Sequence, residues 1–530
     1  MKRRVRSEMA TQWARQAAIL ASAAIIVFWG FYAFDYFTVA HAPHGSGFFD
    51  PLFRYLDFNP TSINNPVSSF SGINAAVFGI VITVVSIVVQ LTAERYTGVA
   101  RMFLRDPVNI LVVGYFVVAC VVSVWLGGAL REDYVPPATV TMVLSLTTGS
   151  LVIMAPYFSY VFWFLEPENI VARIRKEAII LAHRGAKLDD EAESFADQAR
   201  TLSALEELTD VANNSISGQD KIVASAAVDS LKDFALDYLK EKREARPSWF
   251  LIGPEIKLNP DFVAMDPTAL ADLEKRRTWV EWKVMRQFLS IYNEALGSMR
   301  DVNYLIAIDT RYIGEAAAEA KDEQLVELVY RYMNSYLRTT LNAGDVRTAY
   351  NVLNQYRKLV ESMLRMGESQ AAITGVKHMK YYGLVSFERD LRFITETVGY
   401  DVSSIVQLAN QLGSPAEQPI LTEFLELDRP PFVRSQELAL LGVRKAQTKL
   451  AAYYLAAGLP ERARAIANDM REEGPDRLRA IYHQLGNVEN EEFWEIVDRG
   501  KNFDYMPPEQ RAQLGTFFAW LNIDKPPAQA

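Results

Sequence analysis

The chain has 530 residues, of which 50% are hydrophobic, 22% charged and 12% aromatic, and it contains one cysteine. This composition excludes a disordered or low-complexity protein, and the single cysteine excludes a disulfide scaffold and a CxxC metal or redox site. Residues 1–165 hold 10 Lys and Arg against 8 Asp and Glu, whereas residues 166–530 hold 45 against 56. A charge-poor apolar region followed by a charge-rich one predicts a membrane domain over 1–165 and a water-soluble domain after it.

Four stretches of the first domain are apolar and long enough to cross a bilayer, which takes about 20 residues. They run over about 17–40, 73–93, 108–128 and 138–165. The first has a cleaved signal peptide as its alternative, because it follows a basic start and contains Ala40-His41-Ala42. Its apolar run of roughly 24 residues is long for a signal sequence and favours a membrane span.

The distribution of Lys and Arg predicts how these spans are oriented. The N-terminal tail, the loop after the second span and the segment after the fourth span are basic, while the other two loops carry one arginine each. The positive-inside rule therefore predicts that both termini lie in the cytoplasm, which for a bacterial protein means the inner membrane. Arg95, Arg101 and Arg105 are expected to lie at the inner face of this membrane, near anionic lipid.

The second span carries a stripe of small and polar residues at helical spacing. Its members are Gly79, Thr83, Ser86, Gln90 and Glu94. One interpretation is a packing face, since small residues allow membrane helices to approach closely and hydroxyls bond across the interface. The other is the lining of a path for water or ions, because polar groups inside a membrane usually face a protein interior or a cavity.

The sequence VVQLTAERYTGVARMFLRDP over 88–107, followed after another span by YVPPATVTMVL over 134–144, resembles a known pattern. It is similar to bacterial predicted membrane proteins that are grouped as a conserved domain of unknown function. The matching residues are Leu91, Tyr96, Arg101, Phe103, Leu104, Arg105, Asp106, Val135 and Pro136. The resemblance covers about 70–175 and implies the membrane topology, and it implies no catalytic residue because the family has no established activity.

Residues 166–530 show helical periodicity almost throughout, so the chain is expected to be all-α. The segments LNAGDVRTAYNV (341–352) and LAAGLPERARAI (455–466) share a turn around Gly344 and Gly458 and an alanine five residues later, as tetratricopeptide-like repeats do. The glycine spacings do not fit a 34-residue period, so we expect an irregular α-solenoid or helical bundle. The segment 244–267 is expected to pack against helices, with a short hairpin as one form of this packing.

The helix-breaking residues between Gly413 and Arg434 predict two lobes in this domain, over 166–425 and 426–522, followed by a disordered tail over 523–530.

The sequence contains no phosphate-binding loop, dinucleotide fingerprint, zinc-protease motif or nucleophile elbow, so we expect no enzyme, cofactor or metal site. The acidic balance argues against nucleic-acid binding. The favoured function is an integral membrane protein, expected to form homo-oligomers, that presents its cytoplasmic helical domain to a protein partner as a scaffold, anchor or regulator. The alternative is an oligomeric ion channel or transporter whose path is lined by the second span.

Overall fold

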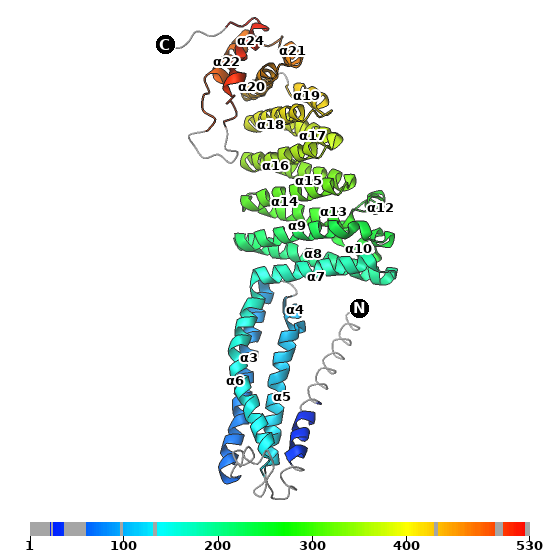
Figure 1. Ribbon diagram of the computed structural model, residues 1–530, viewed down its shortest axis with the longest axis vertical. Helices are drawn as coiled ribbons and strands as arrows, with labels where there is room; N and C mark the ends of the chain where they lie inside the picture. Colours follow the sequence, from blue (N-terminus) through cyan, green and yellow to red (C-terminus); the bar gives the residue numbers. More distant parts are fainter. Residues whose placement is uncertain are drawn as a thin grey trace. The chain divides into compact units, whose positions relative to one another are not determined.

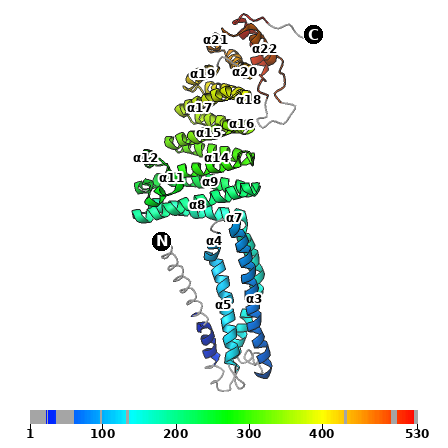
Figure 2. The same cartoon turned by 180° about the vertical axis from the view of Figure 1, so that it is seen from behind.

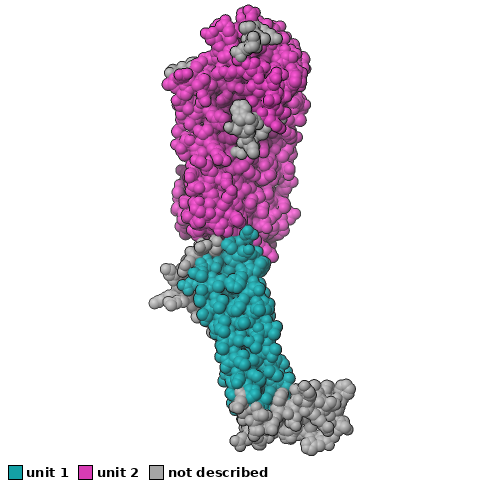
Figure 3. All heavy atoms as spheres, turned by 90° about the vertical axis from the view of Figure 1, so that its left-hand side faces the viewer, with its two compact units in different colours: residues 1–170 teal, residues 171–530 magenta. Residues whose placement is uncertain are grey.

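The computed structural model describes residues 22, 25–35, 60–95, 99–130, 135–428, 433–492 and 502–524. Every regular element in these ranges is helical, which confirms the expected all-α fold (Figure 1). The chain divides into two compact units, residues 1–170 and residues 171–530 (Figure 3). This division does not test the two lobes expected within the second unit, which stay a prediction.

Unit 1 is built from long apolar helices. Their bounds are Ile25–Asp35, α3 Pro60–Arg95, α4 Val99–Arg105, α5 Pro107–Ala129 and α6 Pro137–Leu165. By length and composition, Pro66–Ala93, Pro107–Ala129 and Pro137–Leu165 each suffice to cross a membrane. Of the first expected span, 17–40, the structure describes the short apolar helix Ile25–Asp35 and residue 22.

Helix α3 starts well before the apolar stretch from which the second span was predicted. Its first turns contain Pro60 and several polar residues, which made this segment look like a loop in the sequence. A proline costs little at a helix start, because the first N–H groups have no partner within the helix. Helices α3, α5 and α6 pack against each other, with apolar side chains buried between them such as Val81, Phe116 and Val143.

Unit 2 is a stack of helices in two layers. One layer places α9, α14, α16, α18 and α20 side by side, and the other does the same for α8, α13, α15, α17 and α19 (Figures 1 and 2). The bounds are α7 Pro167–Lys187, α8 Glu191–Ser217, α9 Lys221–Glu241, η1 Lys242–Glu244, η2 Pro247–Phe250, α10 Pro254–Lys257, α11 Pro260–Val263, α12 Pro267–Arg276, α13 Trp279–Ala295, α14 Arg300–Glu319, α15 Glu323–Asn342, α16 Val346–Arg365, α17 Ser369–Glu388, α18 Arg392–Gln411, α19 Glu417–Leu425, α20 Arg434–Ala456, α21 Pro460–Asp469, α22 Pro475–Gly486, α23 Pro508–Arg511 and α24 Leu514–Ala519.

The central part of this stack is more regular than the sequence suggested. Helices α14 to α18 are each 20 residues long and start every 23 residues, at 300, 323, 346, 369 and 392. The second residue after each of these helices has a positive φ, and these residues are Lys321, Gly344, Gly367, Asp390 and Gly413. The expectation of an irregular array is therefore corrected over 300–411, where the array has a constant 23-residue step.

The physical reason for this step is a recurring helix end. In each turn the amide after the positive-φ residue donates to a carbonyl five residues back, as from Asp345 to Thr340 and from Glu368 to Met363. This is the Schellman motif, which ends a helix and reverses the chain within three residues. The alanines five residues after Gly344 and Gly458, which are Ala349 and Ala463, are both fully buried.

The segment 244–267 packs against helices as expected, but it forms short helical turns and no hairpin. Trp249, Ile252 and Phe262 are buried in it. Prolines begin each of its short helices η2, α10 and α11, and a proline at each start favours a new turn over an extended strand. Of the expected tail 523–530, the structure describes residues 523 and 524, and Ile523 is buried.

Candidate functional sites

The polar stripe of the second span points away from the helices that the structure describes around it. Gly79, Thr83, Ser86 and Gln90 are all exposed, while the buried face of α3 carries Asn74, Val77, Val81 and Val85. The Thr83 hydroxyl donates to the Gly79 carbonyl of its own helix at 2.8 Å. The stripe is thus not a packing face within the α3–α5–α6 bundle. The side chain of Glu94, its expected last member, lies outside the described residues.

The buried face of α3 carries a polar contact that sequence analysis missed. The Asn74 amide nitrogen donates to the Ser123 hydroxyl of α5 at 2.7 Å and to the Thr147 hydroxyl of α6 at 3.0 Å. All three residues are buried. One side chain from each helix therefore meets at a single point, which fixes the helices against each other in a setting where water cannot compete.

The family-like motif lies where α4 meets α5, and its residues have structural roles. Asp106 is the N-cap of α5 and accepts from the amides of Val108 and Asn109, and the Tyr160 hydroxyl of α6 donates to it at 2.6 Å. Phe103 is buried with its ring against Phe164, at 5.2 Å between centroids. The motif therefore ties the α4–α5 turn to the end of α6.

The other motif residues lie on the outside of unit 1 or outside the described residues. Leu91 and Leu104 are exposed, as are Arg101 and Arg105. Pro136 precedes α6 as its N-cap residue. The structure does not describe Tyr96 or the side chain of Arg95. An exposed leucine between two exposed arginines suits a membrane surface, as expected from the sequence.

Among the described residues of unit 1, Asp35 is the most deeply buried acid. Its carboxylate accepts from the Ala138 amide at 3.1 Å, the Thr139 amide at 2.9 Å and the Thr139 hydroxyl at 2.7 Å, and it is 0% exposed. Its position near the outer end of the first span predicts solvation at the membrane interface, and its burial contradicts this prediction. It provides the N-terminal cap of α6 from a different helix, where a negative charge is favoured by the helix dipole.

Three hollows in the described part of unit 2 lie over the α13, α15 and α17 layer, and Arg331 lines each of them. We call this surface the Arg331 groove. The first hollow, of about 650 Å³, lies over α15 and α17, and the second, of about 350 Å³, lies over α12, α13 and α15. The third, of about 560 Å³, is lined by Leu289, Asn293, Arg331, Asn334, Ser335, Arg338, Thr339, His378, Tyr381 and Tyr382.

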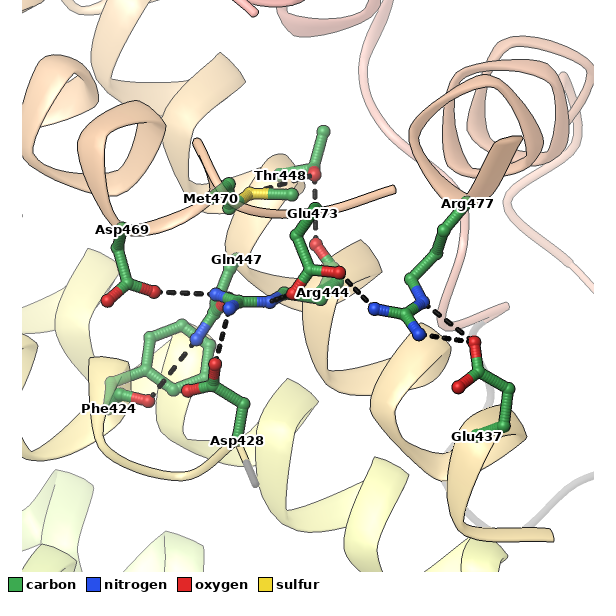
Figure 4. A network of polar contacts seen from close by, with 10 residues as sticks. All are labelled: Phe424, Asp428, Glu437, Arg444, Gln447, Thr448, Asp469, Met470, Glu473 and Arg477. Carbon is green, nitrogen blue, oxygen red and sulfur yellow. Dashed lines mark hydrogen bonds and ion pairs between the residues drawn. The ribbon is translucent and has the colours of Figure 1, made fainter. Parts of the chain in front are cut away.

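A second polar cluster of unit 2 is satisfied internally. Arg444 of α20 lies 2.5 Å from Asp469 and 2.8 Å from Glu473, and it also pairs with Asp428 (Figure 4). Glu473 continues the network to Arg477 of α22. Burial raises the pKa of Asp428, against the lowering effect of Arg444. Because the arginines and carboxylates contact one another, this network joins α19 to α22 and offers no open ligand site.

Among the described residues no group of three or more His, Cys, Asp or Glu side chains has an arrangement that suits a metal ion.

Comparison with known families shows what unit 1 is similar to. Residues 10–238 match the family described as "Predicted membrane protein (DUF2254)". This match confirms the resemblance seen in the sequence and extends it from 70–175 to 10–238, which includes most of unit 1 and reaches into α9. The helices long enough for a bilayer thus lie in a region that is similar to predicted membrane proteins of unknown function.

Other comparisons add little. No curated protein sequence matches the chain. A solved structure described as "Circular tandem repeat protein with novel repeat topology and enhanced subunit contact surfaces" shares 12% identity, with 79% of this chain and 90% of that chain covered. The TM-score is 0.30, so this similarity carries no argument about function.

Proposed function

We propose that the chain is a membrane-anchored scaffold that uses unit 2 to bind a protein partner and carries out no catalysis. Unit 1 anchors it in a bacterial inner membrane with both termini in the cytoplasm, an orientation that rests on the Lys and Arg distribution. The observation that carries the proposal is the Arg331 groove, which extends over successive helices of a repeat stack. Stacked helical repeats commonly bind partners through such extended surfaces.

The groove supports this role because its lining is exposed and chemically mixed. Arg331 and Tyr381 are exposed, and Ser335 and Thr374 are partly exposed. Such a surface offers cationic, aromatic and hydroxyl groups together, the mixture that is typical of protein interfaces.

Photo-cross-linking in living cells tests the scaffold. A photoreactive amino acid at Ser335 or Thr374 is expected to give a discrete cross-link to a protein partner. The control position is Lys358, which is exposed on α16 in the other layer. Cross-links of equal pattern from Lys358, or none from the groove positions, would contradict the scaffold.

A second candidate, an oligomeric channel, is favoured by the exposure of the polar stripe on α3. Intramembrane polar groups that face away from their own bundle suit a contact with further copies of the chain or a path between them. In this case Gln90→Ala changes ion flux into proteoliposomes, whereas Ile87→Ala, a change at an exposed residue beside the stripe, leaves it unchanged. Absence of flux under voltage and under tension would eliminate this candidate.

A further inference from the structure

The third hollow of the Arg331 groove differs in charge from the domain that contains it. Residues 166–530 carry 56 Asp and Glu against 45 Lys and Arg. The lining of this hollow has two arginines, one histidine and no acid, together with two tyrosines and several amide and hydroxyl side chains. The first hollow, by contrast, is lined by Asp322, Glu323, Glu327 and Glu368 as well as by Lys321 and Arg331.

The cationic side chains come from one face of α15. Arg331, Ser335 and Arg338 follow at steps of four and three residues, so they lie in a row along the helix. His378, Tyr381 and Tyr382 form a similar row on α17, and Leu289 and Asn293 do so at the end of α13. The hollow is thus a trough with α15 along its middle.

Arg338 is the side chain in this trough whose charge is open to a ligand. It is exposed, and it hydrogen-bonds the Tyr382 hydroxyl, which lowers the pKa of that tyrosine against the larger effect of burial. Within the part of the chain that the structure describes, no carboxylate pairs with it. Arg331 contacts Glu327 one turn earlier on its own helix, with a side chain that is 58% exposed.

The histidine of the trough does not supply positive charge to a ligand. His378 Nδ1 lies 3.1 Å from the Tyr356 hydroxyl, and burial lowers the pKa of His378. The imidazole is therefore neutral near pH 7, and the positive charge in the trough comes from the two arginines.

From this arrangement we infer that the third hollow binds a small molecule through a phosphate or carboxylate group held by Arg331 and Arg338. The planar guanidinium group matches either oxyanion with two parallel hydrogen bonds. A volume of about 560 Å³ lies in the range of small-molecule sites. The exposed ring of Tyr381 closes one side of the trough and offers an apolar face to the rest of the ligand.

Isothermal titration calorimetry of the purified full chain with pyrophosphate and with citrate tests this inference and separates the two oxyanions. At least one of them is expected to bind at submillimolar concentration, and more weakly as the salt concentration rises. Arg338→Gln is expected to weaken binding about tenfold or more, because it removes charge-assisted hydrogen bonds. Arg338→Lys keeps the positive charge but lacks the planar guanidinium group, and this variant is expected to bind with intermediate affinity.

The matched control is Arg389→Gln, which removes another exposed arginine, just after α17 and outside the trough. This variant is expected to bind as the unchanged chain does. The inference is overturned if neither pyrophosphate nor citrate binds at 1 mM, or if Arg338→Gln and Arg389→Gln have equal effects.

Discussion

At the scale of single residues, Asp35 shows how unit 1 uses a buried carboxylate. It satisfies two amides and one hydroxyl at the start of α6, all in a site closed to solvent. A carboxylate in such a site is stabilised only while these donors surround it. Its place between two apolar helices therefore depends on the position of α6.

Asp35→Ala is expected to destabilise unit 1, because Thr139 loses the acceptor of both its amide and its hydroxyl. Each buried group without a partner costs about 1–3 kcal/mol. Size-exclusion chromatography after heating in detergent measures this loss. The control, Ser145→Ala, removes an exposed hydroxyl that donates to a carbonyl of its own helix. Equal heat resistance of the two variants would contradict the assigned role of Asp35.

Asp309 in unit 2 gives a pH-dependent prediction. Burial raises its pKa from 3.8 to about 7, against the effect of Lys232, whose amino group lies 3.6 Å away, while Asp229 and Asp233 raise the pKa further. The unfolded carboxyl loses its proton near pH 4 and the folded one near pH 7. The free energy of unfolding therefore decreases as the pH rises from about 4 to 7, and it stays low above that.

Asp309→Asn is expected to remove this dependence and to raise the melting temperature at pH 8 more than at pH 5. The gain at pH 8 is about 1–3 kcal/mol, since one pKa unit corresponds to about 1.4 kcal/mol. Circular dichroism of the full chain during heating measures it. Asp237→Asn removes a more exposed carboxylate that pairs with Lys240 and serves as the control. A gain that is equal at both pH values would refute this account of Asp309.

At the scale of elements, the 23-residue step depends on the positive-φ residue of each turn. Glycine adopts this conformation without strain, whereas other residues pay about 1–2 kcal/mol. The structure has glycine at 344, 367 and 413, but Lys321 and Asp390 occupy the same place in the other two turns. The helix ends thus have the same geometry, but the free-energy cost of the positive φ is higher at Lys321 and Asp390 than at the glycines.

Substitutions at two equivalent turns are therefore expected to act in opposite directions. Gly344→Ala is expected to lower the stability of the stack by about 1 kcal/mol or more, and Lys321→Gly to raise it by a fraction of that. Urea unfolding followed by circular dichroism compares them. A stabilising Gly344→Ala would show that the turn is not held in the left-handed region.

These turns also show how far the sequence predicts the fold. The turns at Gly344 and Gly458 and the helical periodicity were enough to predict an all-α stack. The constant 23-residue step was not predicted, because Lys321 and Asp390 interrupt the glycine pattern and their residue types give no indication of a positive φ. Gly344 and Gly367 are 23 residues apart, and Gly367 and Gly413 are 46 apart. This spacing was the sign of a 23-residue repeat in the sequence.

Contacts between distant segments could not be predicted from the sequence for a different reason. The polar stripe of α3 could be predicted from its spacing, but its outward direction depends on which face packs against α5 and α6. Asn74 on the opposite face gave a sign of burial, since a lone amide in an apolar span needs partners. No sequence motif marks Arg331 or Arg338 as site residues, because the trough is formed by three helices that are separate in the sequence.

At the scale of the whole molecule, the orientation of the chain in the membrane stays a prediction. Single cysteines placed at Ser46 and at Ala528, with Cys120 replaced, are expected to react differently with an impermeant maleimide in intact spheroplasts. The Ser46 position is expected to react and the Ala528 position is not, because the basic segments hold both termini inside. Labelling at Ala528 would contradict this orientation.

The central claim is that a membrane unit anchors a helical stack that folds by itself. Expression of residues 166–530, which keeps α7 whole, tests it most directly. The stack has its own buried core, with Trp249, Trp279 and Tyr336 fully enclosed. We expect a soluble, helical fragment that melts cooperatively, and limited proteolysis of it shows whether the chain between 413 and 434 separates two lobes. A fragment that aggregates, or that melts without a cooperative transition, would contradict the claim.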